Sequence, residues 1–160
     1  MLEKLIQLHQ ANRVVQLSGP NGSGKSTLLE QFHIWLFGQG EKFGPYSQHE
    51  AVAENYSSRQ LMALVSSDAL SFAIGWGITA SQLDTPLTQL SSGERTKVLV
   101  SMAIGSGGVV VLDEPFSHLD QQSRNHLRKH IENSPQRFVI ANHEPGYLDD
   151  FPTLILAARS

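Results

Sequence analysis

Short apolar runs alternate with segments of helical periodicity along most of this 160-residue chain. The runs that read as buried strands lie at 13–17, 109–112, 137–141 and 153–156. Apolar residues recur at helical spacing after Lys25 and again after Ser92, which predicts a helix in each place. Strands that alternate with helices indicate an α/β fold, with a mostly parallel sheet flanked by helices.

The stretch 48–91 departs from this alternation. Ser57-Ser58-Arg59-Gln60 fits a capping box ahead of an apolar helical pattern, which predicts a helix there. The apolar run 71–78 is interrupted by Gly75 and Gly77, and its pattern selects neither helix nor strand. We interpret 1–160 as one domain, in which 1–47 and 92–160 form the α/β core and 48–91 an inserted helical subdomain.

Composition and charge narrow the class of protein. The formal net charge is −3 without a basic run, which argues against a dedicated nucleic-acid surface. The sequence has no cysteine, so a disulfide framework and a thiolate metal site are excluded. It has no apolar segment long enough to span a bilayer and no signal-peptide pattern at its start, and we therefore expect a cytoplasmic location.

The run Gly19-Pro20-Asn21-Gly22-Ser23-Gly24-Lys25-Ser26-Thr27 fits the pattern G-x-x-x-x-G-K-[ST] between a predicted strand and a predicted helix. Inward-pointing N–H groups and a helix N-terminus form an anion site, and a lysine there reaches the β- and γ-phosphates. A glycine-rich turn with a chance lysine is the alternative, but the flanking strand and helix favour a nucleoside triphosphate site. The expected contacts are Asn21, Gly22, Ser23, Gly24, Lys25, Ser26 and Thr27.

Two acids, Asp113 and Glu114, follow the continuous apolar run 109–112. Such a run is typical of a buried parallel strand, and ligands bind beyond the carboxyl ends of such strands. Asp113 is placed to hold Mg²⁺, and Glu114 to activate a water molecule facing the γ-phosphate. An acid at this junction can also simply cap the next helix, but the phosphate loop upstream favours the catalytic interpretation.

Further motifs follow in a fixed order. They are Gln48, Leu90-Ser91-Ser92-Gly93-Glu94, Ser117-His118-Leu119-Asp120 and, after the apolar run 138–141, His143. Together with the phosphate loop and the Asp113-Glu114 pair, they span roughly residues 14 to 145. In this combination the chain resembles the ATP-binding cassette (ABC) family of ATPases, whose fold is that of P-loop NTPases.

The resemblance implies roles for individual residues. Ser26, Gln48 and Asp113 would serve Mg²⁺, Glu114 would be the catalytic base, and His143 would contact the γ-phosphate of ATP. In this family two cassettes close head to tail over two ATP molecules. Accordingly, the residues that would meet the nucleotide of a second, identical or paralogous subunit are Ser91, Gly93, Glu94 and Asp120.

The resemblance also implies a function. The leading interpretation is the ATP-hydrolysing subunit of an ABC transporter, held on the inner face of the cell membrane by an integral-membrane permease. The segment 112–120 is similar to the corresponding segment of haem-exporter ATP-binding subunits of cytochrome c maturation. A soluble ABC-type ATPase, acting in DNA repair, on chromosomes or in another mechanochemical role, is the alternative. Tyr46, Phe72 and Trp76 are candidate contacts for a permease, with core packing as the alternative.

Two departures from the family pattern matter for the nucleotide. Residues 1–18 contain no Phe, Tyr or Trp to stack on adenine, and His9 is the only ring there. We therefore expect weak discrimination between nucleobases, because stacking contributes about 1 kcal/mol per ring. In addition, Ser92 stands where the family more often has glycine, and we expect this serine to be tolerated.

Overall fold

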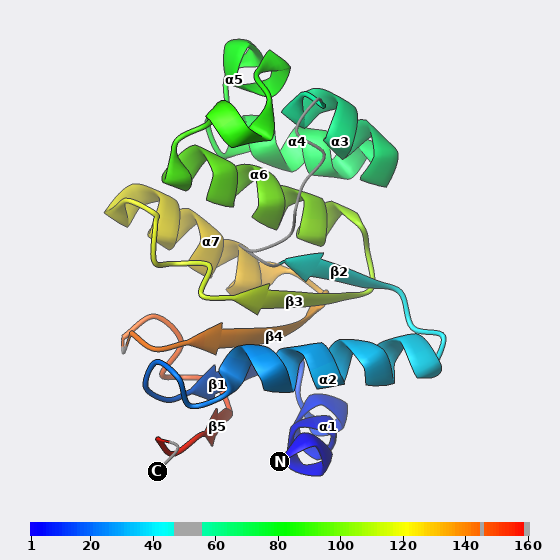
Figure 1. Ribbon diagram of the computed structural model, residues 1–160, viewed down its shortest axis with the longest axis vertical. Coiled ribbons are helices and arrows are strands. Elements are labelled where there is room, and N and C mark those ends of the chain that lie inside the picture. The colour runs from blue at the N-terminus through cyan, green and yellow to red at the C-terminus, as the bar shows by residue number, and fades with distance from the viewer. Residues whose placement is uncertain (47–55, 145, 159–160) are drawn as a thin grey trace.

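One parallel sheet forms the centre of the computed structural model, which describes residues 1–46, 56–144 and 146–158. Its strands are β1 (Val14–Ser18), β2 (Phe43–Tyr46), β3 (Val109–Asp113), β4 (Arg137–Asn142) and β5 (Thr153–Ile155). They lie in the order β2-β3-β4-β1-β5, and every neighbouring pair is parallel (Figure 1). The α/β class expected from the sequence is confirmed.

Helices cover both faces of the sheet. Alternate side chains of each strand point to opposite faces, so each strand contributes apolar residues to both helical layers. Val109 and Val111 pack with α1 (Leu2–Ala11) and α2 (Lys25–Gly38) on one face. Val110 and Leu112 pack on the other face, with α6 (Ser92–Gly105) and α7 (Gln121–Asn133). Both sides of β3 are therefore buried, which explains its uninterrupted apolar run.

Between residues 56 and 91 the described chain forms α3 (Ser58–Val65), α4 (Ser67–Gly75), α5 (Ala80–Asp84) and a short 3-10 helix at Leu87–Gln89. These elements lie over α6, away from the sheet (Figure 1). The capping box at Ser57 is confirmed, since the Ser57 hydroxyl and the Gln60 amide side chain exchange hydrogen bonds with each other's backbone. No helix in the described part of the chain is both long and apolar enough to cross a bilayer.

Helix α4 resolves the run that the sequence pattern left unassigned. Gly75 is its last residue, and Gly77 follows with a φ of +87°, so the two glycines end the helix rather than interrupt it. The Ser66 hydroxyl caps α4 and also donates to the carbonyl of Gly105 at 2.6 Å. The start of α4 is thereby fixed to the end of α6.

The N-terminal segment forms a helix that the sequence analysis did not predict. Helix α1 buries Leu5 and His9, and the His9 ring contacts Phe32 and Trp35 of α2 edge-on, at centroid distances of 5.0 and 6.2 Å. Neither ring nitrogen of His9 has a hydrogen-bond partner in the described structure. Burial, together with the charge of Arg137, lowers the pKa of His9 from 6.5 to about 4.

The contact between α4 and α6 gives a first testable prediction. A Cβ added at Gly105 would lie 2.5 Å from the backbone nitrogen of Ala69, whereas one at Gly38 would meet nothing within 4 Å. Both glycines end a helix, so Gly38→Ala is a matched control. We expect Gly105→Ala to lower the free energy of unfolding by about 1–3 kcal/mol, and Gly38→Ala to leave it unchanged or raise it by up to about 1 kcal/mol. Urea denaturation measures both, and equal effects would contradict this packing.

The buried histidine gives a second prediction. Since the pKa of His9 is lower in the folded chain than in the unfolded chain, its stabilising contribution is complete above pH 6.5 and is lost as the pH falls toward 4. The full contribution is at most about 3 kcal/mol. We expect His9→Leu to flatten the fall of unfolding free energy between pH 6.5 and 4, measured by denaturant titration. An unchanged slope would show that the pKa of His9 is the same in the folded and the unfolded chain. Burial also lowers the pKa of His33, His126 and His130, so some slope remains.

Candidate functional site

The phosphate loop predicted from the sequence connects β1 to α2. Gly24 is the N-cap of α2 with a φ of +94°, a left-handed conformation that favours glycine. Gly19 is required for space, because an added Cβ would lie 2.5 Å from the carbonyl oxygen of Leu156. The loop therefore follows a path close to the C-terminal segment and ends at the positive end of the α2 dipole.

Lys25 occupies the first position of α2 and is only 6% exposed. Its Nζ donates to the carbonyl of Gly19 at 2.8 Å and lies 3.2 Å from Oε1 of Glu114. Ser26 and Thr27 follow in the first helical turn, and both are exposed. A buried ammonium and two accessible hydroxyls thus lie at the helix N-terminus, where an anion is favoured.

Glu114 follows β3 in a left-handed conformation with a φ of 51°, which is uncommon for a residue with a side chain. Its backbone N–H donates to the carbonyl of Ala141 in β4 at 2.9 Å, which fixes this turn to the neighbouring strand. Its carboxylate accepts from the backbone N–H of His143 at 3.2 Å and lies 2.5 Å from the ring Nδ1 of the same residue. The ends of β1, β3 and β4 therefore bring together Lys25, Glu114 and His143.

This arrangement can bind a polyphosphate and activate water. The ammonium and the helix dipole attract negative charge, and a carboxylate beside a histidine can accept and pass on a proton. Asp113, half-buried at the end of β3, and the exposed hydroxyl of Ser26 are oxygen donors of the kind that Mg²⁺ prefers. The residues present therefore fit a magnesium-bound phosphate chain. Gln48, the third predicted magnesium contact, lies outside the described residues.

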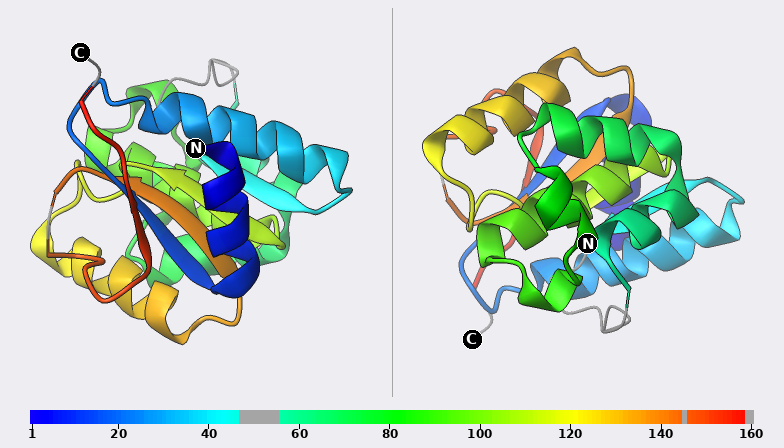
Figure 2. Two further views of the ribbon diagram at one scale, coloured as in Figure 1. Left: turned by 90° about the horizontal axis from the view of Figure 1, so that it is seen from below. Right: turned by 90° about the horizontal axis from the view of Figure 1, so that it is seen from above.

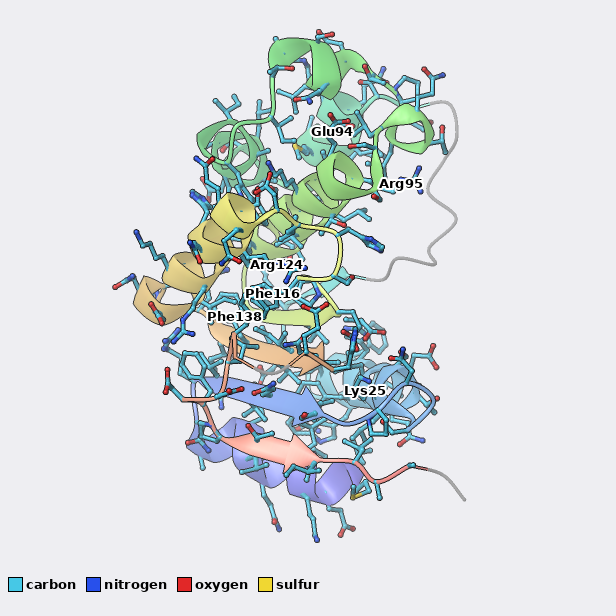
Figure 3. All side chains as sticks on the ribbon, turned by 90° about the vertical axis from the view of Figure 1, so that its left-hand side faces the viewer. Lys25, Glu94, Arg95, Phe116, Arg124 and Phe138 are labelled. Carbon is cyan, nitrogen blue, oxygen red and sulfur yellow. The ribbon has the colours of Figure 1, made fainter. Side chains whose placement is uncertain are left out.

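The second group of predicted residues lies apart from the first. The Ser91 hydroxyl caps α6, and the Glu94 carboxylate accepts from the backbone N–H of Ser91 at 3.0 Å and from the Gln82 amide at 2.7 Å. These hydrogen bonds, the backbone one first, lower the pKa of Glu94. Figure 3 shows Glu94 and Lys25 in separate parts of the molecule.

Asp120 closes this second group. Its carboxylate caps α7 by accepting from the backbone N–H of Ser123 at 2.7 Å, and this hydrogen bond lowers the pKa of Asp120. Ser91, Gly93, Glu94, His118 and Asp120 line one hollow of about 230 Å³. We call it the signature hollow. It contains no residue of the phosphate loop, so one chain carries two separate groups of predicted site residues.

The signature segment depends on glycine at one position. A Cβ at Gly93 would lie 2.9 Å from the carbonyl oxygen of His118, so any side chain there would displace the turn that leads to Asp120. Ser92, in contrast, is the exposed first residue of α6. The tight position is therefore Gly93, and the serine that departs from the family pattern has room.

One positioning residue, Arg124, has no signal in the sequence pattern. Its guanidinium donates to the carbonyl of Leu119 at 2.8 Å, to the Glu144 carboxylate at 2.9 Å and to the Tyr147 hydroxyl at 2.5 Å. It therefore ties the turn before Asp120 to the segment after His143. These partners lie 5, 20 and 23 residues away in the sequence, and no local motif identifies them.

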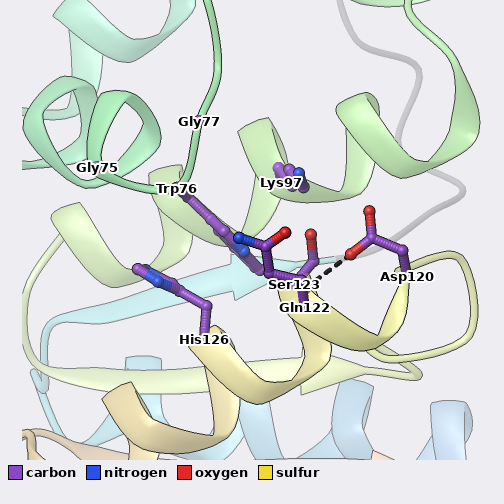
Figure 4. Close-up of a pocket in the computed structure, with 8 residues that line it drawn as sticks. All are labelled: Gly75, Trp76, Gly77, Lys97, Asp120, Gln122, Ser123 and His126. Atoms are coloured by element: carbon purple, nitrogen blue, oxygen red, sulfur yellow. Dashed lines mark hydrogen bonds between the residues drawn. The ribbon is translucent and has the colours of Figure 1, made fainter.

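Trp76 is a core residue rather than an exposed contact. It is 5% exposed, and its indole stacks on the ring of His126 with centroids 5.6 Å apart. It lines a hollow of about 260 Å³ together with Lys97 and Asp120. Figure 4 shows Trp76 between α6 and α7. Among the alternatives for Trp76, the core interpretation therefore applies. Nothing is described for the side chain of Tyr46.

The fold and the phosphate loop together define a P-loop nucleotide-binding domain. Solved structures with this fold include a cobalt transport ATP-binding protein (TM-score 0.74, 23% identity, 89% of this chain and 64% of that one). They also include a dimeric bacterial ABC transporter cassette (TM-score 0.73, 17% identity, 91% and 82% of the two chains). An archaeal ribosome recycling factor, solved with a ribosomal stalk protein, matches with a TM-score of 0.70 at 20% identity over 89% of this chain and 31% of that one.

Sequence relatives point the same way. The zinc import ATP-binding protein ZnuC of Acinetobacter baylyi is 33% identical over 147 residues, or 84% of this chain and 56% of the relative. Elongation factor 3 of Candida glabrata is 28% identical over 148 residues, or 84% of this chain and 14% of the relative. A comparison with models of known protein families finds no match. The chain belongs to the family of ATP-binding cassette (ABC) ATPases. It spans only 14% to 56% of these two relatives.

Proposed function

We propose that this domain binds ATP with Mg²⁺ and hydrolyses it. The observation that carries the proposal is the cluster of Lys25, Glu114 and His143 at one end of the phosphate loop. The triphosphate would be held by the loop N–H groups and by Asn21, Gly22, Ser23, Gly24, Lys25, Ser26 and Thr27.

Each residue of the cluster has a distinct part in this mechanism. Lys25 neutralises the β- and γ-phosphates. Ser26, Asp113 and Gln48 would hold a magnesium ion, which would supply further positive charge to the phosphates. Glu114 takes the proton of the attacking water, and its strained, hydrogen-bonded backbone keeps the carboxylate in place. His143, next to that carboxylate, contacts the γ-phosphate.

The second group of residues supports a head-to-tail dimer. Ser91, Gly93, Glu94 and Asp120 lie apart from the phosphate loop of their own chain, so they would meet the nucleotide of a second ABC subunit. Ser91 and the N-terminus of α6 would then face the partner's γ-phosphate, while Glu94 keeps Ser91 in position. The bacterial transporter cassette with the same fold was solved as a dimer.

The work performed by this dimer has two candidate forms. Relatives named for zinc import and cobalt transport favour an ABC transporter subunit, bound to a permease on the cytoplasmic face of a membrane. Relatives named as elongation factor 3 and as the ribosome protection protein VmlR of Bacillus subtilis favour a non-transport role. VmlR is 27% identical over 156 residues, or 88% of this chain and 28% of the relative. We favour transport, because ZnuC is 33% identical over 84% of this chain, whereas elongation factor 3 and VmlR are 28% and 27% identical over similar shares of it.

The proposed catalytic base gives a third prediction. Glu114→Gln removes the proton acceptor but keeps the shape of the side chain, so ATP turnover falls by about 100-fold or more while nucleotide binding persists. Glu132→Gln, which changes an exposed carboxylate on α7, is the matched control and leaves turnover unchanged. Phosphate release and ATP titration measure the two properties. Full turnover by Glu114→Gln would refute the assigned base.

The same variant separates the two candidate roles. Tagged Glu114→Gln protein, purified from detergent-solubilised native cells with Mg·ATP, should retain the partners of the ATP-bound state. Recovery of a polytopic membrane protein supports transport. Recovery of ribosomal or other non-membrane partners in its place overturns the transport proposal.

Two helix caps of the same type give a fourth prediction, which tests the dimer. Ser91 and Ser57 both cap a helix through a capping box, so replacing either with alanine lowers stability by about 1 kcal/mol. Only Ser91→Ala should also lower ATP turnover, by at least about tenfold, because only Ser91 would face a partner's phosphate. Equal turnover in the two variants would restrict Ser91 to a structural role.

A further inference from the structure

A hollow of about 310 Å³ opens beside the phosphate loop. Its walls come from the loop, from one side of α2 and from the segment that follows β5. The lining residues include Ser23, Thr27, Leu28, Gln31, Leu156 and Ala157. We call it the side hollow.

The side hollow and the catalytic cluster are lined by different residues. Glu114 and His143 do not line it, although Lys25, with which Glu114 pairs, is only two residues from Thr27. A triphosphate with its terminal phosphate near Lys25 and Glu114 must direct its nucleoside away from them. The side hollow is a space next to the loop on a side that Glu114 and His143 do not line.

The outer wall of the side hollow is fixed to the phosphate loop. Leu156 is 6% exposed, and its backbone N–H donates to the carbonyl of Ser18 at 2.7 Å, directly before the loop. Strand β5 pairs with β1 up to Ser18, and the carbonyl of Leu156 approaches Gly19 so closely that no Cβ fits there. Figure 2 shows the C-terminal segment passing along the edge of the sheet near the start of α2. The wall is therefore preformed.

Two polar groups complete the side hollow. The Ser23 hydroxyl is buried, with the residue 6% exposed, and has no hydrogen-bond partner in the described structure. Gln31, exposed on α2, offers an amide with both a donor and an acceptor. Apolar walls with a few polar groups are typical of sites for small organic molecules.

We propose that the side hollow holds the nucleobase and ribose of the bound nucleotide, between the Leu28 and Leu156 side chains, with the Gln31 amide at the edge of the base. This inference rests on the proposed ATP site. No described residue that lines the hollow is aromatic, and the His9 ring is buried against Phe32 instead. Because the amide can turn to present either its donor or its acceptor, adenine and guanine are bound almost equally.

The test compares Mg·ATP, Mg·GTP and Mg·tripolyphosphate, which lacks base and ribose, by isothermal titration calorimetry on the full chain. The wild type should bind ATP and GTP within about fivefold of each other. Gln31→Ala should weaken both nucleotides by about threefold to tenfold, as expected for one lost hydrogen bond, and leave tripolyphosphate unchanged. Gln7→Ala, an exposed glutamine on α1 outside the hollow, should change none of the three.

Two more variants separate this inference from the function on which it rests. Leu156→Asn makes the wall polar and should weaken ATP by at least about fivefold, with tripolyphosphate unchanged. A thermal melt checks that Leu156→Asn is folded. If it is not, the test relies on Gln31→Ala, because Gln31 is exposed. Lys25→Ala should weaken all three ligands. If it does while Gln31→Ala and Leu156→Asn bind ATP like the wild type, the side hollow is not the base site. If Lys25→Ala changes nothing, the proposed ATP site itself is wrong.

Discussion

The parallel register of three strands is the constraint on which the site depends. Ser18 of β1 pairs with Asn142 of β4, and Asp113 of β3 pairs with Ala141. Since parallel strands end at the same edge, the residues that follow each strand meet there. The phosphate loop, Glu114 and His143 are such residues, although more than a hundred positions separate the first from the last. A slip of one residue in any pair would turn buried side chains to the opposite face and separate the cluster.

Much of the fold follows from local patterns in the sequence. The run 109–112 predicts a buried strand, and the capping box at Ser57 predicts where α3 begins. Helix α1 was not predicted. It is stabilised by the burial of Leu5 and His9, and the His9 ring packs against α2, a segment that is distant in the sequence. Helix α4 was not predicted, because Gly75 and Gly77 resemble residues that break a helix. The structure shows that they lie at its C-terminal end.

The residues of the candidate site also divide into those that the sequence predicts and those that it does not. Residues in short motifs, such as Lys25 and Glu114, could be assigned from the sequence because their spacing reflects a local turn. Arg124 and Leu156 could not, because each acts on a segment that is distant in the chain. For Glu94 the structure adds contacts that the motif does not indicate: its carboxylate accepts hydrogen bonds from the Ser91 backbone and the Gln82 side chain. Its contact with a partner's nucleotide stays a prediction.

Helix α7 connects the two groups of site residues. Its N-cap, Asp120, lines the signature hollow, and Arg124, one turn further on, reaches the segment after His143. Arg124 also holds the carbonyl of Leu119, directly before Asp120. A displacement of the His143 segment therefore cannot leave Asp120 in place unless the hydrogen bonds of Arg124 break. Charge-assisted hydrogen bonds contribute more than neutral ones, about 1.5–3 kcal/mol each, so joint movement of the two segments costs less than separating them. Arg124 therefore couples the position of Asp120 to that of the segment after His143.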